Sequence, residues 1–369
     1  MSKICCIFNL GPLYRWPIYS LMAKELSCDF YLGDKTFTPI KTFDYQKLGG
    51  FRGYLRFKKR KHFYSLKGAL QPIFNRNYKT YIVTGDRACL EIWVLLFWAI
   101  FTKKKVCLWC HGWHSDCSKR ATFLNAIFYR LADHILLYGN DSMNYMLKRG
   151  IPVSKMTCIY NSLNYDKQLE YRKTTFPSDI FREHFRNDNP NLFYIGRLQN
   201  RKRLDIVIKA MHYLADMGIA TNFTYVGERS DKIDIDSLIH SYHLEAVTWE
   251  FGPLYEERTK AELMTSADIC VSPGNIGLTA MDSLMYGLPI ITNDDFSSQM
   301  PEYEAIEEGK NGLFFKKGDE IDLANKIISW LSYAKTHTRE EISQACYKPI
   351  DEKYNPHYQI KILKEVLFQ

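Results

Sequence analysis

A glycine-bearing turn at residues 273–277 has the residue types and the spacing to hold an anion. The turn, PGNIG, lies between a short apolar run at 269–272 and a stretch from 278 whose apolar residues recur at helical spacing. The first N–H groups of a helix lack partners inside the helix, and the helix dipole adds about half a positive charge there. Glycine lets an anion approach the backbone closely. The stretch predicts either a phosphate-binding turn or an ordinary strand-to-helix connection.

Two cations follow another strand-like run, at residues 192–195. Arg197 and Lys202 lie in the loop GRLQNRKR, which leads into a predicted helix from 204 to about 217. If this loop borders the same cleft as the glycine turn, two positive charges and a helix start converge. That combination suits a bound diphosphate and stabilises a departing one. The alternative is a solvated basic loop, because Arg201 and Arg203 lie in it as well.

A cysteine and histidine cluster raises the question of a metal. Cys107 and Cys110 precede His111 in the pattern of a haem attachment site, and His114 and Cys117 would extend it to a zinc site. However, residues 106–110 read as a strand, on which positions three apart point to opposite faces. We therefore expect neither a metal nor a haem here.

Two successive series of alternating strands and helices must position these residues. The expected strands of the first half are 4–8, 29–32, 81–84, 106–110, 135–138 and 156–160, and those of the second half are 192–195, 222–226, 248–251, 269–272 and 290–292. The chain has no G-x-G-x-x-G fingerprint, which argues against a standard dinucleotide site. Such a pattern predicts two Rossmann-like α/β halves facing a cleft.

Length and charge agree with two domains that have different partners. The chain has 369 residues. Residues 1–165 carry 25 Lys and Arg against 9 Asp and Glu, a net charge of +16, whereas the remaining residues carry 24 against 32, a net charge of −8. A basic half suits anionic lipid or nucleic acid. No nucleic-acid-binding motif is present, so we expect lipid.

Two segments of the first half favour a membrane surface. Residues 51–62 interleave six Lys and Arg with aromatic residues, and residues 92–101 form an uninterrupted run of ten apolar residues. The run is shorter than the roughly 20 residues that span a bilayer. It predicts either a buried crossover helix or an interfacial helix on lipid. Several of the ten cysteines lie in apolar runs and no secretory signal is visible, so we expect a cytoplasmic protein with reduced thiols.

An ordered set of motifs in the second half resembles the retaining family 4 glycosyltransferases of the GT-B fold. The motifs are GRLxxxKR from 196, VGE from 226, FG at 251–252, the stretch 274–289 and PExxxxxEGKNGLFF from 301. The likeness is close over residues 192–330 and loose in the first half, through residues 159–162, His111 and the loop around Gly11. It implies a membrane-facing acceptor domain at 1–165, a nucleotide-sugar domain at 190–350, and a helix at 351–369 that returns to the first domain.

The resemblance also assigns roles to particular residues. Arg197 and Lys202 match the pair that binds the donor diphosphate, and His111 matches a histidine near the reacting centre, although a structural strand-end histidine remains an alternative. Of two acidic residues eight apart, the one that holds the ribose falls on Asp282, while the one that contacts the donor sugar falls on Gly274. The further donor contacts implied are Gly11, Phe251, Gly252, Gly274, Asn275, Ile276, Gly277, Leu278 and Thr279.

The resemblance implies retaining transfer of a sugar from a nucleotide-diphosphate sugar to a glycan or lipid-linked acceptor, in surface polysaccharide or lipopolysaccharide synthesis. We expect peripheral attachment to the inner face of the membrane, no cofactor, no nucleic-acid partner and no obligatory metal. A D-x-D sequence at Asp234 and Asp236 lies in an acidic stretch and reads as a helix start. The alternatives are a catalytically degenerate scaffold, which Gly274 would suit, and a sugar-nucleotide epimerase.

Overall fold

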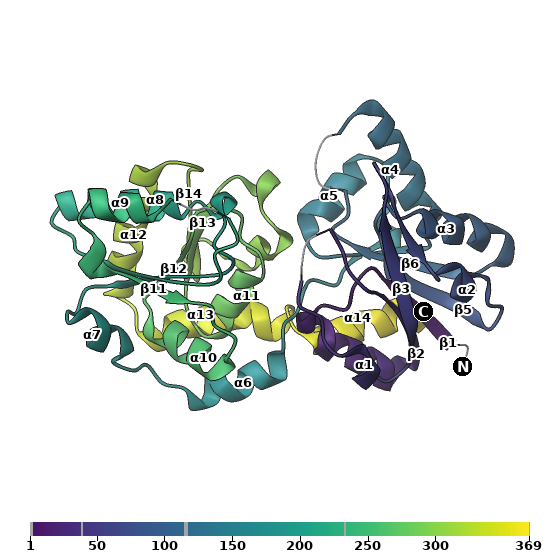
Figure 1. Cartoon of the computed structure of the whole chain (residues 1–369), viewed down its shortest axis with the longest axis horizontal. Helices are drawn as coiled ribbons and strands as arrows, with labels where there is room; N and C mark the ends of the chain where they lie inside the picture. The colour runs from purple at the N-terminus through teal and green to yellow at the C-terminus, as the bar shows by residue number, and fades with distance from the viewer. Residues whose placement is uncertain (1–2, 38–39, 114–116, 232–233, 369) are drawn as a thin grey trace. The chain divides into compact units, whose positions relative to one another are not determined.

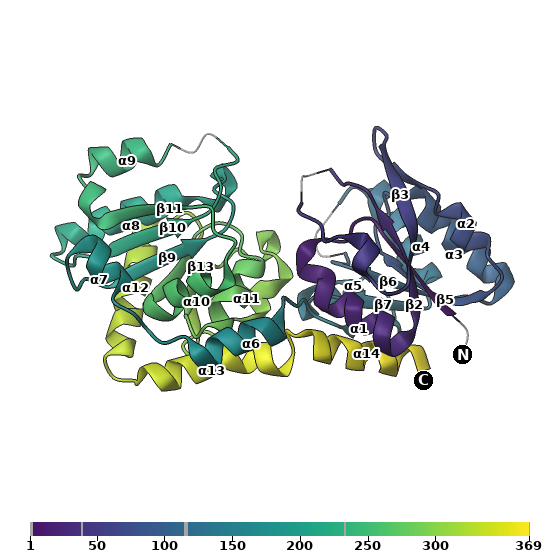
Figure 2. The ribbon, with the colours of Figure 1, turned by 60° about the horizontal axis from the view of Figure 1, so that its bottom comes forward.

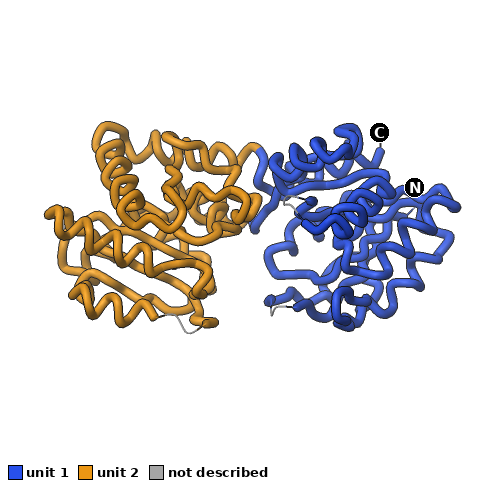
Figure 3. Tube along the Cα trace, turned by 90° about the horizontal axis from the view of Figure 1, so that it is seen from above, with its two compact units in different colours: residues 1–164, 353–369 blue, residues 165–352 orange. Residues whose placement is uncertain are grey.

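The computed structural model describes residues 3–37, 40–113, 117–231 and 234–368. His114, which was weighed above as part of a metal site and not expected to bind one, lies outside these residues. Two compact units make up the described chain (Figure 3). Unit 1 comprises residues 1–164 and 353–369, and unit 2 comprises residues 165–352.

Unit 1 is a parallel sheet with helices on both faces. Within the described residues, the strand order is β4-β3-β2-β1-β5-β6-β7-β8, and only β3 and β4 pair antiparallel (Figures 1 and 2). The strands are β1 (Lys3–Phe8), β2 (Cys28–Gly33), β3 (Phe51–Lys59), β4 (Tyr64–Lys67), β5 (Tyr78–Thr84), β6 (Lys105–Cys110), β7 (His134–Leu137) and β8 (Met156–Cys158). The helices are α1 (Trp16–Leu26), α2 (Leu70–Phe74), α3 (Leu90–Thr102), α4 (Lys119–Leu131), α5 (Asn140–Lys148) and α14 (Pro356–Phe368).

The central strands of unit 1 are apolar along their whole length because both of their faces are covered. Residues 4–8 of β1 are all buried, as expected of a parallel strand between two helix layers. The last helix, α14, packs beside α1, so that Ile360 and Leu363 join Met22 in one core (Figure 2). The C-terminal residues therefore complete the fold of the N-terminal half.

Unit 2 repeats the architecture with a smaller sheet. Its strand order is β11-β10-β9-β12-β13-β14 among the described residues, and all the pairings are parallel. The strands are β9 (Asn191–Ile195), β10 (Asn222–Val226), β11 (Thr248–Gly252), β12 (Ile269–Ser272), β13 (Ile290–Asn293) and β14 (Gly312–Phe315). The helices are α6 (Tyr165–Thr174), α7 (Ile180–Phe185), α8 (Leu204–Asp216), α9 (Asp236–Ser241), α10 (Glu257–Ser266), α11 (Leu278–Met285), α12 (Glu320–Ala334) and α13 (Arg339–Glu352).

The expectation of a GT-B fold with two Rossmann-like halves is confirmed. Helices α6 and α7 lie in the polar stretch between the two expected domains, 1–165 and 190–350, and both helices belong to unit 2. The polar residues of α6 are explained by their contacts within unit 2. Gln168 donates a hydrogen bond to Asp282 of α11, and Arg172 donates one to Asp351 of α13. The D-x-D sequence lies at the start of α9, as expected.

The apolar run at 92–101 lies in α3, and this helix is buried on one face only. Ile92, Leu95, Leu96 and Ala99 are buried against the unit. The opposite face exposes four apolar side chains: Val94 (38 %), Phe97 (48 %), Ile100 (55 %) and Phe101 (80 %). The buried face of α3 fits the expected crossover helix, and its exposed apolar face fits the expected interfacial helix. In the part of the chain that the structure describes, no helix is long and apolar enough to span a bilayer.

Candidate functional site

The predicted site residues of unit 2 gather at one edge of its sheet. Because β9, β10, β11 and β12 run parallel, the loops that follow them emerge at the same edge. Those loops begin with Gly196, Gly227, Pro253 and Pro273 respectively. The basic loop and the glycine turn are therefore neighbours, as the sequence suggested.

Lys202 joins the basic loop to the glycine turn directly. Its Nζ donates hydrogen bonds to the backbone carbonyl of Asn275 at 2.5 Å and to the side-chain Oδ1 of Asn275 at 3.1 Å. The ammonium group is partly buried beside two other cations, so burial first, and then Arg201 and Arg197, lower the pKa of Lys202 to about 8. An anion bound here would reverse that shift. Lys202 therefore places at the turn a positive charge whose pKa depends on whether an anion is bound.

Arg197 lies at the end of β9 with an exposed side chain. No carboxylate among the described residues lies within ion-pair distance of its guanidinium. The neighbouring backbone is fixed, because the Tyr194 hydroxyl donates to the Arg197 carbonyl at 3.3 Å. The arginine is therefore available to an external anion.

The turn at 273–277 is held by side chains from β13 and the segment after it. Asn293 Nδ2 donates to the carbonyls of Pro273 (3.0 Å) and Gly274 (2.8 Å). Gln299 Oε1 accepts the N–H of Ile276 at 2.7 Å. These two side chains were not predicted from the sequence, since nothing in their local pattern indicates which turn they support.

Two N–H groups of the expected phosphate turn are already used inside the protein. The N–H of Gly274 donates to the Lys202 carbonyl at 3.0 Å, and that of Ile276 donates to Gln299. The helix α11 begins at Leu278 with Gly277 as its N-cap, and no side chain caps it. The backbone N–H groups that remain for an anion in residues 274–279 are therefore those of Asn275 and of the helix start at Gly277, Leu278 and Thr279.

Gly274 is a glycine because the backbone of the basic loop touches it. A Cβ atom at this position would lie 2.3 Å from the Arg201 carbonyl oxygen and 2.6 Å from the Lys202 Cα. No side chain fits there without moving the basic loop. The position that carries an acidic residue in the resembled family is thus closed to any side chain in this protein.

Asp282 lies one turn into α11 within a network of polar side chains. Its Oδ1 accepts from Lys260 Nζ at 2.6 Å and from Gln168 Nε2 at 2.7 Å. Lys260 also pairs with Glu257 at 2.9 Å, which accepts the Tyr286 hydroxyl at 2.6 Å. Burial by itself lowers the pKa of Lys260, but the two carboxylates raise it above its usual value. Asp282 is held rigidly, with 17 % of its side chain exposed.

The residues predicted to line the nucleotide base lie at the end of β11, the outermost strand on one side of the sheet. Phe251 and Gly252 end β11, and the half-buried Phe251 ring packs 5.1 Å from that of Trp249. Gly252 has a φ of +86°, and its carbonyl accepts the N–H of Gly227 at 2.9 Å. The glycine is therefore required by the backbone of the turn.

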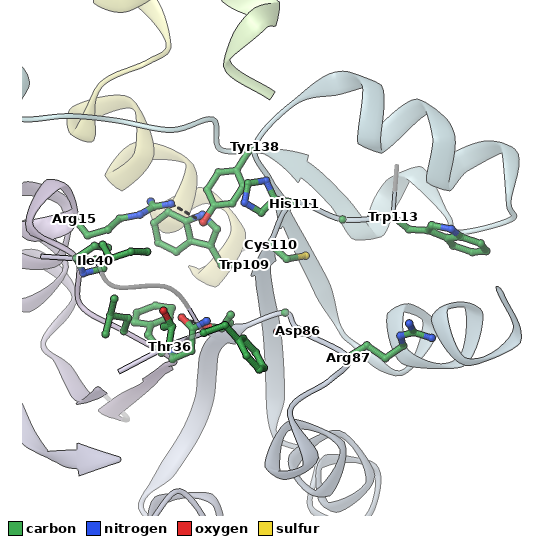
Figure 4. Close-up of a pocket in the computed structure, with 18 of the residues that line it drawn as sticks. Arg15, Thr36, Ile40, Asp86, Arg87, Trp109, Cys110, His111, Trp113 and Tyr138 are labelled. Carbon is green, nitrogen blue, oxygen red and sulfur yellow. Dashed lines mark hydrogen bonds between the residues drawn. The ribbon is translucent and has the colours of Figure 1, made fainter. Parts of the chain in front are cut away.

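In unit 1 the carboxyl ends of β1, β5, β6 and β7 surround a cavity of about 630 Å³ (Figure 4). His111 follows β6 at the rim of this cavity, and its ring lies 4.7 Å from the ring of Tyr138. Gly11 is not among the residues that line the cavity, although its neighbours Leu10 and Pro12 are. Its N–H donates to the Tyr45 hydroxyl at 2.9 Å, and a Cβ atom would lie 2.7 Å from the Tyr45 ring. Packing therefore explains this glycine, and its role toward a donor remains a prediction.

No group of three or more His, Cys, Asp or Glu that could hold a metal ion occurs among the described residues. Cys107 and Cys110 are both buried in β6, and burial raises the pKa of each thiol to about 12. They are core thiols in this structure.

Comparison with known proteins finds a family likeness within the second unit. Residues 176–348 match the family model described as Glycosyl transferases group 1. A Klebsiella pneumoniae protein described as an uncharacterized 41.2 kDa protein in the cps region is 22 % identical over 237 residues, or 63 % of this chain and 60 % of that protein. The putative colanic acid biosynthesis glycosyltransferase WcaL of Salmonella typhimurium is 25 % identical over 41 % of this chain and 40 % of its own length.

Solved structures match the whole fold at lower identity. HepE from Anabaena in complex with UDP has a TM-score of 0.71 at 14 % identity, with 99 % of each chain covered. The lipopolysaccharide outer core galactosyltransferase WaaB has the same TM-score, identity and coverage. The stretches matched in the curated relatives span between 20 % and 60 % of those proteins. The protein thus has the GT-B fold, and its residues 176–348 are similar to the glycosyl transferases group 1 family.

Proposed function

We propose that the protein is a retaining hexosyltransferase that moves a sugar from a nucleotide-diphosphate donor to a glycan or lipid-linked acceptor. The observation that carries the proposal is the contact of Lys202 with Asn275, next to the start of α11, which no side chain caps, and to Arg197, which has no carboxylate partner among the described residues. All of these lie in the segment that matches the family. A diphosphate is the ligand whose charge and oxygen atoms suit two cations and a helix start.

The same groups would act during transfer. As the bond between the sugar and the diphosphate breaks, negative charge grows on the leaving phosphate, and preorganised cations stabilise it there. In a front-face mechanism the leaving phosphate takes the proton of the acceptor hydroxyl. We assign Arg197 and Lys202 to the leaving group, Asp282 to the donor ribose, and His111 to the reacting centre. The two cations supply the charge that a metal would otherwise supply, so we propose that no metal is required.

The relatives support a donor nucleotide to test first and a biological setting. Structures of HepE contain UDP and UDP-glucose, so we propose a uridine-diphosphate sugar. The Klebsiella protein comes from a cps region, and WcaL is described in colanic acid biosynthesis. Surface polysaccharide synthesis is therefore the proposed setting. By this proposal the acceptor binds in the cavity of unit 1.

Unit 1 also offers a surface for an anionic membrane, which we propose as its docking site at the inner face. The exposed face of α3 continues onto α2, where Leu70 and Phe74 are 44 % and 46 % exposed and the Phe74 ring lies 5.3 Å from that of Trp98. Helix α3 also packs on β4, whose partner β3 exposes several cations. An apolar patch beside Lys and Arg is the pattern of interfacial binding, with about 1 kcal/mol for each cation near anionic lipid.

Vesicle flotation tests this docking site. Replacement of Phe97, Ile100 and Phe101 by serine should lower binding to vesicles of anionic phospholipid. Phe176→Ser in unit 2, where the side chain is 75 % exposed, is the matched control and should leave binding unchanged. Equal binding of the wild type to neutral and anionic vesicles would contradict the membrane proposal.

A thermal-shift panel tests the central proposal. Wild-type protein is heated with UDP, GDP, ADP or CMP and with the corresponding sugars, in the presence of a chelator. A ligand at 100 times its Kd stabilises by about 2.7 kcal/mol, which raises the Tm by several degrees. A response to one nucleotide, lost in Lys202→Met, supports the donor site. Gly274 also fits a catalytically degenerate scaffold, and silence across the whole panel would favour that reading.

A further inference from the structure

The cavity of unit 1 has aromatic walls and an arginine among them. Its lining includes Tyr14, Arg15, Trp109 and Tyr138, which come from the segment before α1 and from the ends of β6 and β7 (Figure 4). Arg15 is 4 % exposed, so this cation is withdrawn from water. A charge in such a position normally has a paired carboxylate.

Arg15 has no such carboxylate in the part of the chain that the structure describes. Its guanidinium carbon lies 4.9 Å from the centre of the Trp109 ring and 5.0 Å from that of Tyr138, and its Nη2 donates to the Tyr138 hydroxyl at 2.5 Å. Aromatic faces and one hydroxyl oxygen offset part of the cost of burying the cation. The charge itself remains uncompensated.

Two hydrogen-bond donors in this wall have no acceptor among the described residues. They are Nη1 of Arg15 and Nε1 of Trp109, and both are buried. Buried polar atoms in folded proteins nearly always have a partner, so each unpaired donor needs an explanation. Both groups are donors and neither accepts, so the missing partner must be an acceptor.

The other charged residues of the lining leave the cavity electropositive. They are Asp86 and Arg87, so the charges of the described lining sum to one positive charge. Asp86 Oδ1 accepts the N–H of Ala88 at 2.9 Å, and Arg87 Nη1 donates to the Ala121 carbonyl at 3.2 Å. Both are thus hydrogen-bonded to backbone groups, whereas Nη1 of Arg15 and Nε1 of Trp109 have no acceptor among the described residues.

We propose that Arg15 and Trp109 select an acceptor that carries an anionic group, either a carboxylate or a phosphate, with its sugar ring against the aromatic wall. This inference rests on the proposed function, because it names the class of acceptor for that reaction. An anion at this place pairs the buried charge and accepts from both donors. A neutral sugar would leave the charge uncompensated, so it should bind more weakly.

Binding of three matched probes to the wild-type protein tests the inference without a donor. The probes are octyl glucoside, octyl glucuronide and octyl glucoside 6-phosphate, each below its micellar concentration, with Kd measured by calorimetry. A charge-assisted contact predicts that at least one anionic probe binds about tenfold to a hundredfold more tightly than the neutral one. The stronger of the two identifies carboxylate or phosphate as the natural group. Equal binding, or no binding by either anionic probe, overturns the inference.

Variants identify the residue responsible. Arg15→Met should abolish the preference for the anionic probe, and Arg15→Lys should keep part of it. Arg130→Met, which removes an exposed charge from α4, is the control and should keep all of it. If Arg15→Met fails to fold, the probe comparison in the wild type still decides. A full preference in a folded Arg15→Met protein would overturn the assignment.

Nucleotide binding separates this inference from the proposed function. Arg15→Met should keep the thermal stabilisation by UDP, because the donor site is assigned to unit 2. Loss of that stabilisation would mean that Arg15 serves the donor, and the inference would fall. A wild type that prefers anionic probes but responds to no nucleotide would instead contradict the proposed function and leave the anion site standing.

Discussion

The two units of this protein place different kinds of sites at equivalent edges of their sheets. In unit 2 the edge is closed by backbone: Gly274 touches the basic loop, Asn293 and Gln299 hold the turn, and Lys202 is hydrogen-bonded to it. In unit 1 the edge holds a cavity of about 630 Å³ with aromatic walls and an arginine that has no carboxylate partner among the described residues. Contacts from the backbone suit the part of a ligand that does not differ from one substrate to another, such as the diphosphate of the donor. Side-chain walls suit a part that varies, such as an acceptor.

Among the substitutions that test this contrast, Gly274→Ala is expected to cause the largest loss of activity. The new Cβ would overlap the Arg201 carbonyl and displace the loop that carries Lys202. A displacement of about 1 Å at a reacting site costs on the order of a hundredfold in rate, and overpacking costs about 1–3 kcal/mol of stability. Steady-state kinetics and a thermal melt measure both. Gly53→Ala in β3, where a Cβ would lie 3.8 Å from the Tyr31 ring, is the control. Wild-type kinetics in Gly274→Ala would contradict the inference that the backbone of the basic loop excludes a side chain at position 274.

Arg197→Ala is expected to have the next largest effect. Loss of a charge-assisted contact worth about 1.5–3 kcal/mol should reduce kcat/KM by roughly tenfold to a hundredfold or more. Arg182→Ala removes an arginine that is 66 % exposed elsewhere in unit 2 and should stay near wild-type activity. Activity of Arg197→Ala within about twofold of wild type would contradict the role given to Arg197.

The pKa of Lys202 predicts a pH dependence of nucleotide binding. Burial and two neighbouring arginines lower this pKa to about 8 in the free protein, and a bound diphosphate raises it again. The protonated form binds the anion. Affinity for UDP should therefore be constant from pH 7 to nearly 8, then fall by up to about tenfold for each further pH unit. Calorimetry over pH 7 to 9.5 measures this. Lys202→Arg should flatten the profile, and a flat profile in the wild type would refute the assignment.

The smallest effect is expected in the exposed face of unit 1. Phe101 is 80 % exposed, so Phe101→Ser should change the free energy of unfolding by no more than about 0.5 kcal/mol. Denaturant unfolding measures this. A loss above 2 kcal/mol would show that the side chain supports the fold, and the apolar face would then need no membrane to explain it.

Most strands and the central helices were predictable because their signals are local. Residues 4–8 and 269–272 are continuous apolar runs, and both form buried parallel strands. The helix at 278–285 shows apolar spacing, with Gly287 and Pro289 shortly after it. By contrast, α6 and α7 lie in polar sequence that suggested a boundary, since their stability comes from packing and hydrogen bonds within unit 2.

The candidate site was predictable only where a motif is continuous in sequence. Arg197, Lys202 and the turn at 273–277 were identified because each lies in a short, ordered motif. Asn293, Gln299 and Lys260 were missed, because each reaches the site from another segment. The N–H groups of Gly274 and Ile276 were wrongly expected to be open to phosphate. Their internal acceptors, the Lys202 carbonyl and Gln299, become visible only when the chain is folded.

The sequence by itself determined the two α/β halves, the basic first half and the order of the donor-site motifs, because composition, periodicity and turn residues are local properties. Only the tertiary structure decided why position 274 is glycine, which N–H groups remain at the start of α11, and that Arg15 lies buried beside Trp109 without a carboxylate among the described residues. These facts depend on contacts between residues that are 70 to 100 positions apart, such as Lys202 with Asn275 and Arg15 with Trp109. Such contacts follow from packing and leave no mark on the local sequence.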